Sequence, residues 1–136
     1  MEYCQSGDLA RIIQQRKATN LRLTENEVMQ WFVQVALALK YTHSRRILHR
    51  DIKASNVYLS AGNCIKLGDF GVSKALQGTL ESALTIIGTP YYMSPEVYKG
   101  NSYTLKSDIW GLGCFLYELC SFTVNFSYLP LASIYS

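Results

Sequence analysis

Two strongly patterned helical segments, at 24–43 and about 105–121, constrain the fold of this chain more than any other feature. Thr24 and Glu27 form a capping box, in which each side chain bonds the backbone amide of the other, so a helix should begin there and end near His43. Apolar residues then recur at helical spacing and predict one buried stripe: Val28, Phe32, Val35, Ala36 and Leu39. The second segment is apolar on nearly every side, which predicts a central, buried helix.

Shorter patterns predict the remaining elements. Asp8 is suited to cap a short helix over 8–16. Residues 56–60 and 64–67, joined by Ala-Gly-Asn, are typical of a hairpin of two short strands. Residues 68–103 are rich in glycine and proline, which predicts a long and mostly irregular segment, and such segments in compact domains usually carry function. The expected fold class is therefore α+β, mainly α.

Length, charge and cysteine usage exclude several kinds of protein. A chain of 136 residues forms at most one domain. Its net charge of +3 is too small and too scattered for a nucleic-acid-binding protein. No apolar run approaches the roughly 18 residues that a membrane span needs. The four cysteines show neither zinc spacing nor a C-x-x-C pair, which favours reduced thiols in an intracellular protein. The oligomeric state stays open.

The first chemistry-bearing motif is the loop sequence His49-Arg-Asp-Ile-Lys-Ala-Ser-Asn56. An isolated aspartate in a loop is usually a helix cap or a solvated residue. Phosphoryl transfer, however, explains three members of this loop together. Asp51 can orient a hydroxyl and accept its proton, Lys53 can lie beside the transferring phosphoryl group, and Asn56 can supply a neutral oxygen ligand to Mg²⁺.

Two further motifs follow in the chain. Gly68-Asp-Phe-Gly71 comes directly after the second predicted strand, so the Asp69 carboxylate would lie at the strand end, where it can bridge to Mg²⁺. The sequence G-T-P-Y-Y-M-S-P-E over 88–96 would, taken alone, be a proline-rich turn. Three such motifs in this order and at this spacing leave little room for chance.

Together, the motifs resemble the signature of eukaryotic protein kinases, H-R-D with a following asparagine, then D-F-G, then S-P-E. The similarity is strongest to the NIMA-related serine/threonine kinases. MEYCQSGDL resembles that family's hinge and the start of helix D, LHRDIKASNVYL its catalytic loop, IGTPYYMSPE its substrate-docking segment and SDIWGLGCFLYELC its helix F. The resemblance implies part of a protein-kinase C-terminal lobe over residues 1–121, with helices D, E and F, a short hairpin and a long activation loop. A divergent tail, 122–136, would follow.

The resemblance also implies roles for individual residues. Asp51 would be the catalytic base, Lys53 would steady the γ-phosphate, and Asn56 and Asp69 would hold Mg²⁺. The residues that it assigns to ATP binding are Met1, Glu2, Cys4, Tyr58, Lys53, Asn56 and Asp69, with Met1 at the gatekeeper position and Tyr58 on the floor of the adenine site.

Four more roles concern regulation and loop geometry. By resemblance, Thr85 would be the activating phosphothreonine and Arg50 the arginine that meets its phosphate. Thr89 would hydrogen-bond toward the catalytic aspartate. Asp108, on helix F, would hold the backbone of the catalytic loop.

The implied activity is that of a non-specific serine/threonine protein kinase, which transfers the γ-phosphate of ATP to protein Ser/Thr hydroxyls. Lysine at position 53, together with G-T-P-Y-Y, implies serine/threonine rather than tyrosine specificity. Protein substrates would be the partners, with no nucleic acid and no membrane. The implied location is cytoplasmic and is compatible with association with the cytoskeleton.

The sequence also departs from the family pattern. Nothing in it resembles a G-x-G-x-x-G phosphate loop or a V-A-I-K lysine, so the expected fold lacks an N-terminal lobe, and the arginine that normally pairs with Glu96 is missing. Three interpretations stay open. The first is a truncated kinase with weak or no activity alone. The second is a non-catalytic kinase-like interaction module, and the third is a poorly folded product without function. Retention of Asp51, Lys53, Asn56 and Asp69 favours the first.

Overall fold

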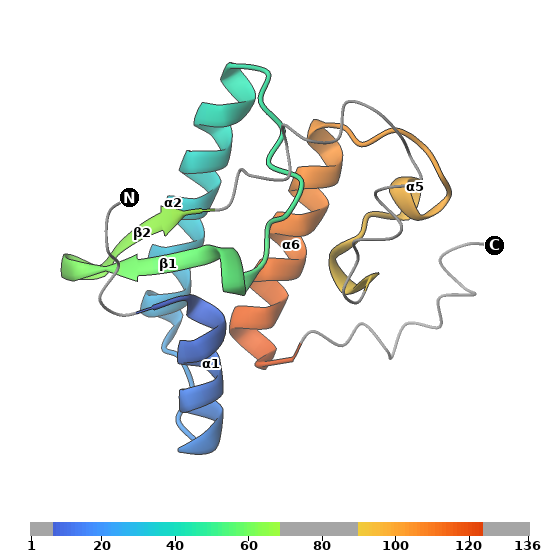
Figure 1. Cartoon of the computed structure of the whole chain (residues 1–136). Helices are drawn as coiled ribbons and strands as arrows, with labels where there is room; N and C mark the ends of the chain where they lie inside the picture. Colours follow the sequence, from blue (N-terminus) through green and yellow to red (C-terminus); the bar gives the residue numbers. More distant parts are fainter. Residues whose placement is uncertain (1–6, 69–89, 124–136) are drawn as a thin grey trace.

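The computed structural model describes residues 7–68 and 90–123, which form helices beside one small antiparallel sheet (Figure 1). The helices are α1 (Leu9–Ala18), α2 (Glu25–Ser44), α5 (Pro95–Tyr98) and α6 (Leu105–Ser121), and the strands are β1 (Val57–Ser60) and β2 (Cys64–Leu67). Short 3-10 turns occupy Ala54–Asn56, Ala61–Asn63 and Pro90–Tyr92. The predicted α+β, mainly α, fold class is confirmed.

Local capping chemistry fixes where the first two helices begin. The Asp8 side chain accepts a hydrogen bond from the amide of Arg11 at 2.9 Å. The Thr24 hydroxyl accepts from the Glu27 amide at 3.2 Å, and the Glu27 carboxylate accepts from the Thr24 amide at 2.8 Å. The predicted capping box is therefore confirmed, and each such cap stabilises its helix by about 1 kcal/mol. Helix α1 runs two residues beyond its predicted end.

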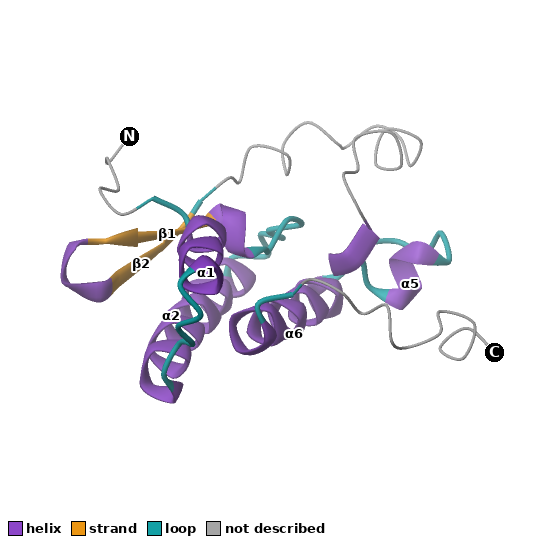
Figure 2. Ribbon diagram, turned by 90° about the horizontal axis from the view of Figure 1, so that it is seen from below, coloured by secondary structure: helices purple, strands orange, loops and turns teal. Residues whose placement is uncertain are grey.

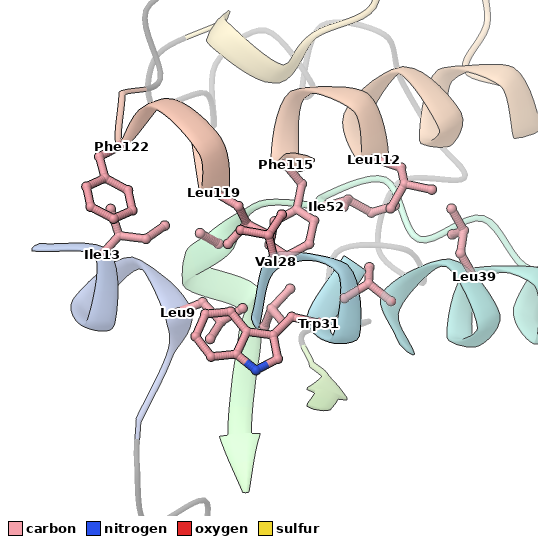
Figure 3. Close-up of a cluster of buried hydrophobic side chains, with 13 residues drawn as sticks. Leu9, Ile13, Val28, Trp31, Leu39, Ile52, Leu112, Phe115, Leu119 and Phe122 are labelled. Atoms are coloured by element: carbon pink, nitrogen blue, oxygen red, sulfur yellow. The ribbon is translucent and has the colours of Figure 1, made fainter. Parts of the chain in front are cut away.

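Helices α2 and α6 lie side by side (Figures 1 and 2) and run in opposite directions (Figure 1). Their facing sides, together with α1, the loop before β1 and β1 itself, enclose a single apolar cluster. Phe115 and Leu119 of α6 and Val35 of α2 have no exposed surface. The labelled core side chains in Figure 3 are Leu9, Ile13, Val28, Trp31, Leu39, Ile52, Leu112, Phe115, Leu119 and Phe122. This helix pair is the platform on which the loop 49–56 rests.

The apolar pattern predicts a central, buried helix, and within the described part of the chain α6 meets this prediction over part of its surface. The side that faces α2 and the loop 49–56 is buried, whereas Ile109 is 54% exposed and Trp110 is 37% exposed. Leu105 and Tyr117 are also exposed on that outer side. Among the described residues, α2 and the turns Ala54–Asn56 and Pro90–Tyr92 contact α6, and these contacts leave part of its apolar surface exposed. No helix among the described residues is both long and apolar enough to cross a membrane.

The hairpin is fastened to α2 by side-chain hydrogen bonds. The Trp31 indole nitrogen donates to Oδ1 of Asn63 at 2.7 Å, and Oε1 of Gln34 accepts from the Ile65 amide at 2.8 Å. Asn63 has φ of 61°, a left-handed conformation that asparagine tolerates better than most residues. Antiparallel pairing of Val57 with Leu67 closes the open end of the hairpin. The pairing brings Asn56 beside Gly68, whose amide donates to the Asn56 carbonyl at 2.9 Å.

Two segment predictions differ in detail from the structure. Asn56, predicted as the first residue of a strand, belongs instead to the 3-10 turn that precedes β1. The predicted irregular segment 68–103 is described at residue 68 and from residue 90 onward, where it contains the 3-10 turn and α5. Residues 69–89 lie outside the described part of the chain.

Candidate active site

Three predicted site residues of the loop 49–56 come together. The Lys53 ammonium lies 2.9 Å from Oδ2 of Asp51. The Asn56 amide nitrogen donates to the same Oδ2 at 2.8 Å and to the Asp51 backbone carbonyl at 2.8 Å. The side chains of Asp51 and Lys53 are about one-third exposed, at 33% and 36%, while Asn56 is buried. The cluster therefore presents a carboxylate and a cation to solvent above a fixed amide.

The backbone of this loop is held from below by one buried carboxylate. Asp108, near the start of α6, has no exposed surface. Its Oδ2 accepts from the His49 amide at 2.9 Å, and its Oδ1 accepts from the Arg50 amide at 2.9 Å. The predicted role of Asp108, to hold the backbone of the loop, is confirmed.

Two further side chains complete the surroundings of Asp108. The Tyr103 hydroxyl donates to Oδ1 at 2.6 Å, and Nε2 of His43 lies 2.7 Å from Oδ2. Each carboxylate oxygen thus has one backbone amide and one side-chain group as partners. Burial alone would raise the pKa of Asp108, but the hydrogen bonds, led by that of Tyr103, outweigh it and hold the pKa below its usual value. Asp108 is therefore an anion in the folded protein at neutral pH.

The fully buried imidazole of His49 connects the loop 49–56 to the residue before the D-F-G aspartate. Its Nδ1 accepts from the Asp51 amide at 3.3 Å, and its Nε2 lies 3.0 Å from the Gly68 carbonyl. A carbonyl can only accept, so Nε2 carries the hydrogen in this arrangement. The ring thereby couples the Asp51 backbone to the end of β2.

Arg50 has two unusual features. Its φ of 69° places it in the left-handed region, which non-glycine residues seldom occupy. Its Nε is buried and has no hydrogen-bond partner among the residues that the structure describes. A buried guanidinium nitrogen of this kind can donate to an anion.

Tyr58 packs directly against the end of the hairpin. A Cβ atom added to Gly68 would lie 2.7 Å from Cε2 of the Tyr58 ring, closer than side-chain contacts allow. Position 68 must therefore be glycine for this ring to remain in place. Tyr58 itself is half-buried, and its predicted place on the floor of an adenine site remains a prediction.

A second buried carboxylate braces the other end of the loop. Glu118 of α6 accepts from the Ala54 amide at 3.3 Å and from the Tyr92 hydroxyl. Burial raises the pKa of Glu118, against the hydrogen bonds from Tyr92 and Ala54. Helix α6 therefore holds the loop at two points, through Asp108 and Glu118.

Glu96, whose usual arginine partner is missing from the sequence, is not fully buried. It is half-exposed, and its carboxylate accepts from the Ser107 hydroxyl at 2.9 Å. Its own backbone amide, followed by the hydroxyl of Ser107, holds its pKa below the usual value despite some desolvation. Solvent and these donors replace the buried partner that was expected.

Three groups around this site could not be predicted from the sequence. His43 and Tyr103 bind Asp108, and Glu118 holds Ala54 and Tyr92, yet no local pattern marks any of them. One signal could have pointed to them. Acidic residues inside an otherwise apolar helix must be hydrogen-bonded when buried, which requires donors from elsewhere in the chain.

Several predicted site residues lie outside the described part of the chain. They are Met1, Glu2 and Cys4 of the predicted hinge, Asp69 of the predicted Mg²⁺ site, and the predicted regulatory residues Thr85 and Thr89. Among the described residues, no group of three or more His, Cys, Asp or Glu could hold a metal ion.

The donor chemistry of Asn56 fits the Mg²⁺ role nevertheless. Its Nδ2 donates to two oxygens of Asp51, so Oδ1 is the atom left for a cation. An amide oxygen is a ligand that Mg²⁺ accepts. The site can therefore orient a hydroxyl, supply a positive charge and contribute one oxygen ligand.

Comparisons with known proteins agree with this geometry. The family model described as "Protein kinase domain" matches residues 1–131. The chain is 50% identical over 121 residues to serine/threonine-protein kinase Nek1 of Mus musculus, covering 89% of this chain and 10% of that protein. It is also 50% identical over 122 residues to serine/threonine-protein kinase Nek5 of Homo sapiens, covering 89% of this chain and 17% of that protein. The chain thus spans less than a fifth of these relatives' length, and the predicted resemblance to NIMA-related kinases is confirmed.

Proposed function

The chain belongs to the protein kinase domain family, and we propose that it carries the phosphoryl-transfer loop of a serine/threonine kinase. The reaction is transfer of the ATP γ-phosphate to hydroxyls of protein substrates. The observation that carries the proposal is the cluster of Asp51, Lys53 and Asn56, joined by contacts of 2.8–2.9 Å. The serine/threonine kinases among its relatives support the same substrate class.

Asp51 is the group that orients the substrate hydroxyl and accepts its proton. Asn56 and the His49–Asp108 contacts fix the carboxylate and its backbone, so little reorganisation is needed when a hydroxyl arrives. The Lys53 ammonium lies beside the carboxylate and can meet the transferring phosphoryl oxygens. Both side chains are accessible to a substrate.

Asn56 and Asp69 are the residues that would hold Mg²⁺ with ATP, and Met1, Glu2, Cys4 and Tyr58 those that would line the adenine site. The bound Mg²⁺ supplies neutralisation of the charge that develops on the phosphoryl oxygens. The orientation of the Asn56 amide supports its part in this assignment. Because phosphate-loop and V-A-I-K motifs are absent from these 136 residues, the chain by itself should bind ATP weakly and transfer phosphate slowly or not at all.

Arg50 supports a regulatory proposal. Its buried Nε has no hydrogen-bond partner among the described residues, so this nitrogen can donate to a phosphate bound beside it. Phosphorylation of Thr85 would add about −1.5 to −2 charge and three acceptor oxygens for Arg50, and Thr89 would then be held near Asp51. In an active protein, Thr85→Ala should lower the rate strongly, while Ser73→Ala and Thr79→Ala should do little.

A non-catalytic interaction module is the second candidate, and the exposed apolar side of α6 favours it. This module would bind a partner protein through an exposed apolar surface, to which Ile109, Trp110 and Tyr117 contribute. A pure binding module, however, does not need the arrangement of Asp51, Lys53 and Asn56.

Two measurements separate these functions. Isothermal calorimetry of the 136-residue chain with Mg-ATP should show weak binding, and a submicromolar dissociation constant would contradict our account of the nucleotide site. A fusion of this chain to the N-terminal lobe of a NIMA-related kinase should phosphorylate a generic serine/threonine substrate. A folded, nucleotide-binding fusion that transfers no phosphate would favour the interaction module.

A further inference from the structure

Tyr103 lies outside the loop 49–56 but bonds the group that holds it. The residue belongs to the connection between α5 and α6, and its half-buried hydroxyl donates to Oδ1 of Asp108 at 2.6 Å. The same Oδ1 accepts from the Arg50 amide at 2.9 Å. A tyrosine on the S-P-E side of the molecule thus shares one oxygen with the residue immediately before Asp51.

We propose that Tyr103 is a positioning residue for the phosphoryl-transfer loop: its hydroxyl fixes Oδ1 of Asp108, and this oxygen in turn fixes the backbone of Arg50 and the direction of Asp51. The inference rests on the proposed function only in naming Asp51 as the base. The hydrogen-bonded arrangement itself is independent of activity.

The two oxygens of Asp108 have separate partners, which makes the role of Tyr103 specific. Oδ1 serves Tyr103 and Arg50, whereas Oδ2 serves His43 and the His49 amide. Loss of the Tyr103 hydroxyl leaves Oδ2 with both of its partners. It frees Oδ1 to move with respect to the Arg50 amide, so the disturbance should begin at Arg50.

Arg50 is the residue in this loop that most needs such support. Its left-handed backbone, with φ of 69°, is a conformation that L-residues keep only where the surroundings impose it. The bond from its amide to Oδ1 is one of those constraints. A hydrogen bond between a hydroxyl and a buried carboxylate is among the stronger ones in proteins, so Tyr103 is well suited to hold the acceptor in place.

The protonation states favour a lasting contact. Burial, followed by the hydrogen bond to Asp108, raises the pKa of Tyr103 far above neutrality, so the hydroxyl keeps its hydrogen. Tyr103 and Arg50 face Oδ1 of the Asp108 carboxylate. His43 and the His49 segment face its Oδ2, and Asp51 lies farther along the loop. Tyr103 is thus a permanent donor.

Amide hydrogen exchange in the ¹⁵N-labelled 136-residue chain tests the proposal. Tyr103→Phe removes only the hydroxyl, and we expect exchange of the Arg50 amide to accelerate about tenfold or more while the His49 amide changes by less than about threefold. Tyr91→Phe, at an exposed tyrosine of the same chain, is the control and should leave both amides unchanged. Arg50 exchange within twofold of the wild-type value would overturn the proposal.

Two further readouts keep the test decisive. If Tyr103→Phe instead loosens the whole fold, the core amides of Phe115 and Leu119 will exchange as fast as Arg50, and the local positioning role is then refuted. The carboxyl ¹³C resonance of Asp108 should also titrate at a higher pH in Tyr103→Phe than in the wild type, because the hydroxyl no longer stabilises the anion. An unchanged titration would contradict the proposal.

These outcomes are independent of catalysis. If the Arg50 amide responds as expected but the fusion protein described above transfers no phosphate, the proposed function fails and the positioning contact stands. If the fusion is active and Tyr103→Phe leaves Arg50 unaffected, the reverse holds.

Discussion

Replacement of Asp108 by asparagine should destabilise the protein strongly, although the change exchanges only one oxygen for an NH₂ group. The wild-type carboxylate accepts four hydrogen bonds and has no exposed surface. An asparagine side chain has a single oxygen. Whichever position that oxygen takes, its NH₂ group faces the backbone amide of either Arg50 or His49, and a backbone amide cannot rotate away.

The expected magnitude follows from these contacts. A hydrogen bond to a charged group contributes about 1.5–3 kcal/mol, and a buried donor without an acceptor costs about 1–3 kcal/mol. Asp108→Asn should therefore lower the free energy of unfolding by roughly 3–5 kcal/mol, a large part of the 5–15 kcal/mol typical of a domain.

The dependence on pH gives a second signature. Because the pKa of Asp108 is lower in the folded protein than in the unfolded chain, its stabilisation is complete above about pH 4 and is lost as the pH falls through the folded-state pKa. The difference between the wild type and Asp108→Asn should therefore be full at pH 7 and shrink in acid.

Urea denaturation followed by the fluorescence of Trp31, which is 3% exposed in the core, measures both effects. Asp51→Asn is the matched control, because this carboxylate lies in the same loop but is one-third exposed, and it should cost about 1 kcal/mol or less. A loss below 1 kcal/mol for Asp108→Asn at pH 7, or a loss equal to that of the control, would refute the claim that this carboxylate holds the loop.

Three further substitutions test other contacts. Glu118→Gln keeps an acceptor for Tyr92 and Ala54 but removes a buried charge, and burial raises the pKa of Glu118 above its ordinary value. Urea denaturation should therefore show the variant to be at least as stable as the wild type at pH 8, with any advantage gone near pH 4. A large loss of stability at pH 8 would contradict the account. Gly68→Ala should lower the melting temperature, less so in a Tyr58→Ala background, because the added Cβ meets the Tyr58 ring; an equal loss in both backgrounds would exclude this clash. Asn63→Ala should lower the free energy of unfolding by about 1–2 kcal/mol and shift the indole N–H resonance of Trp31. Asn63→Asp, which keeps the acceptor, should lower the free energy of unfolding less, and the reverse order would be evidence against this contact between the hairpin and α2.

The elements that could be predicted from sequence are those fixed by neighbouring residues. The Thr24–Glu27 capping box and the apolar stripe of α2 depend on spacings of three and four, so their pattern is complete within one segment. The cluster of Asp51, Lys53 and Asn56 was predictable for the same reason, because one short loop carries all three groups.

The contacts that sequence could not supply join distant segments. Tyr103 and His43 approach Asp108 only once α2 and α6 have packed, and no local spacing encodes that packing. The same limit explains why burial of α6 was predicted for more of its surface than the structure buries. An apolar helix pattern shows which side chains could be buried, but which side receives a neighbouring element is decided by the tertiary structure. Ile109 and Trp110 illustrate the difference.

The most direct test of the central claim is the turnover of the fusion protein with and without the Asp51 carboxylate. Transfer of the γ-phosphate to a serine/threonine peptide should be measured over a range of ATP and peptide concentrations for the wild-type loop and for Asp51→Asn. If Asp51 is the base, kcat should fall at least about 100-fold while KM for ATP changes little, since the loss affects the transition state rather than nucleotide binding. An Asp51→Asn fusion that keeps kcat within a few-fold of the wild-type value would contradict the account.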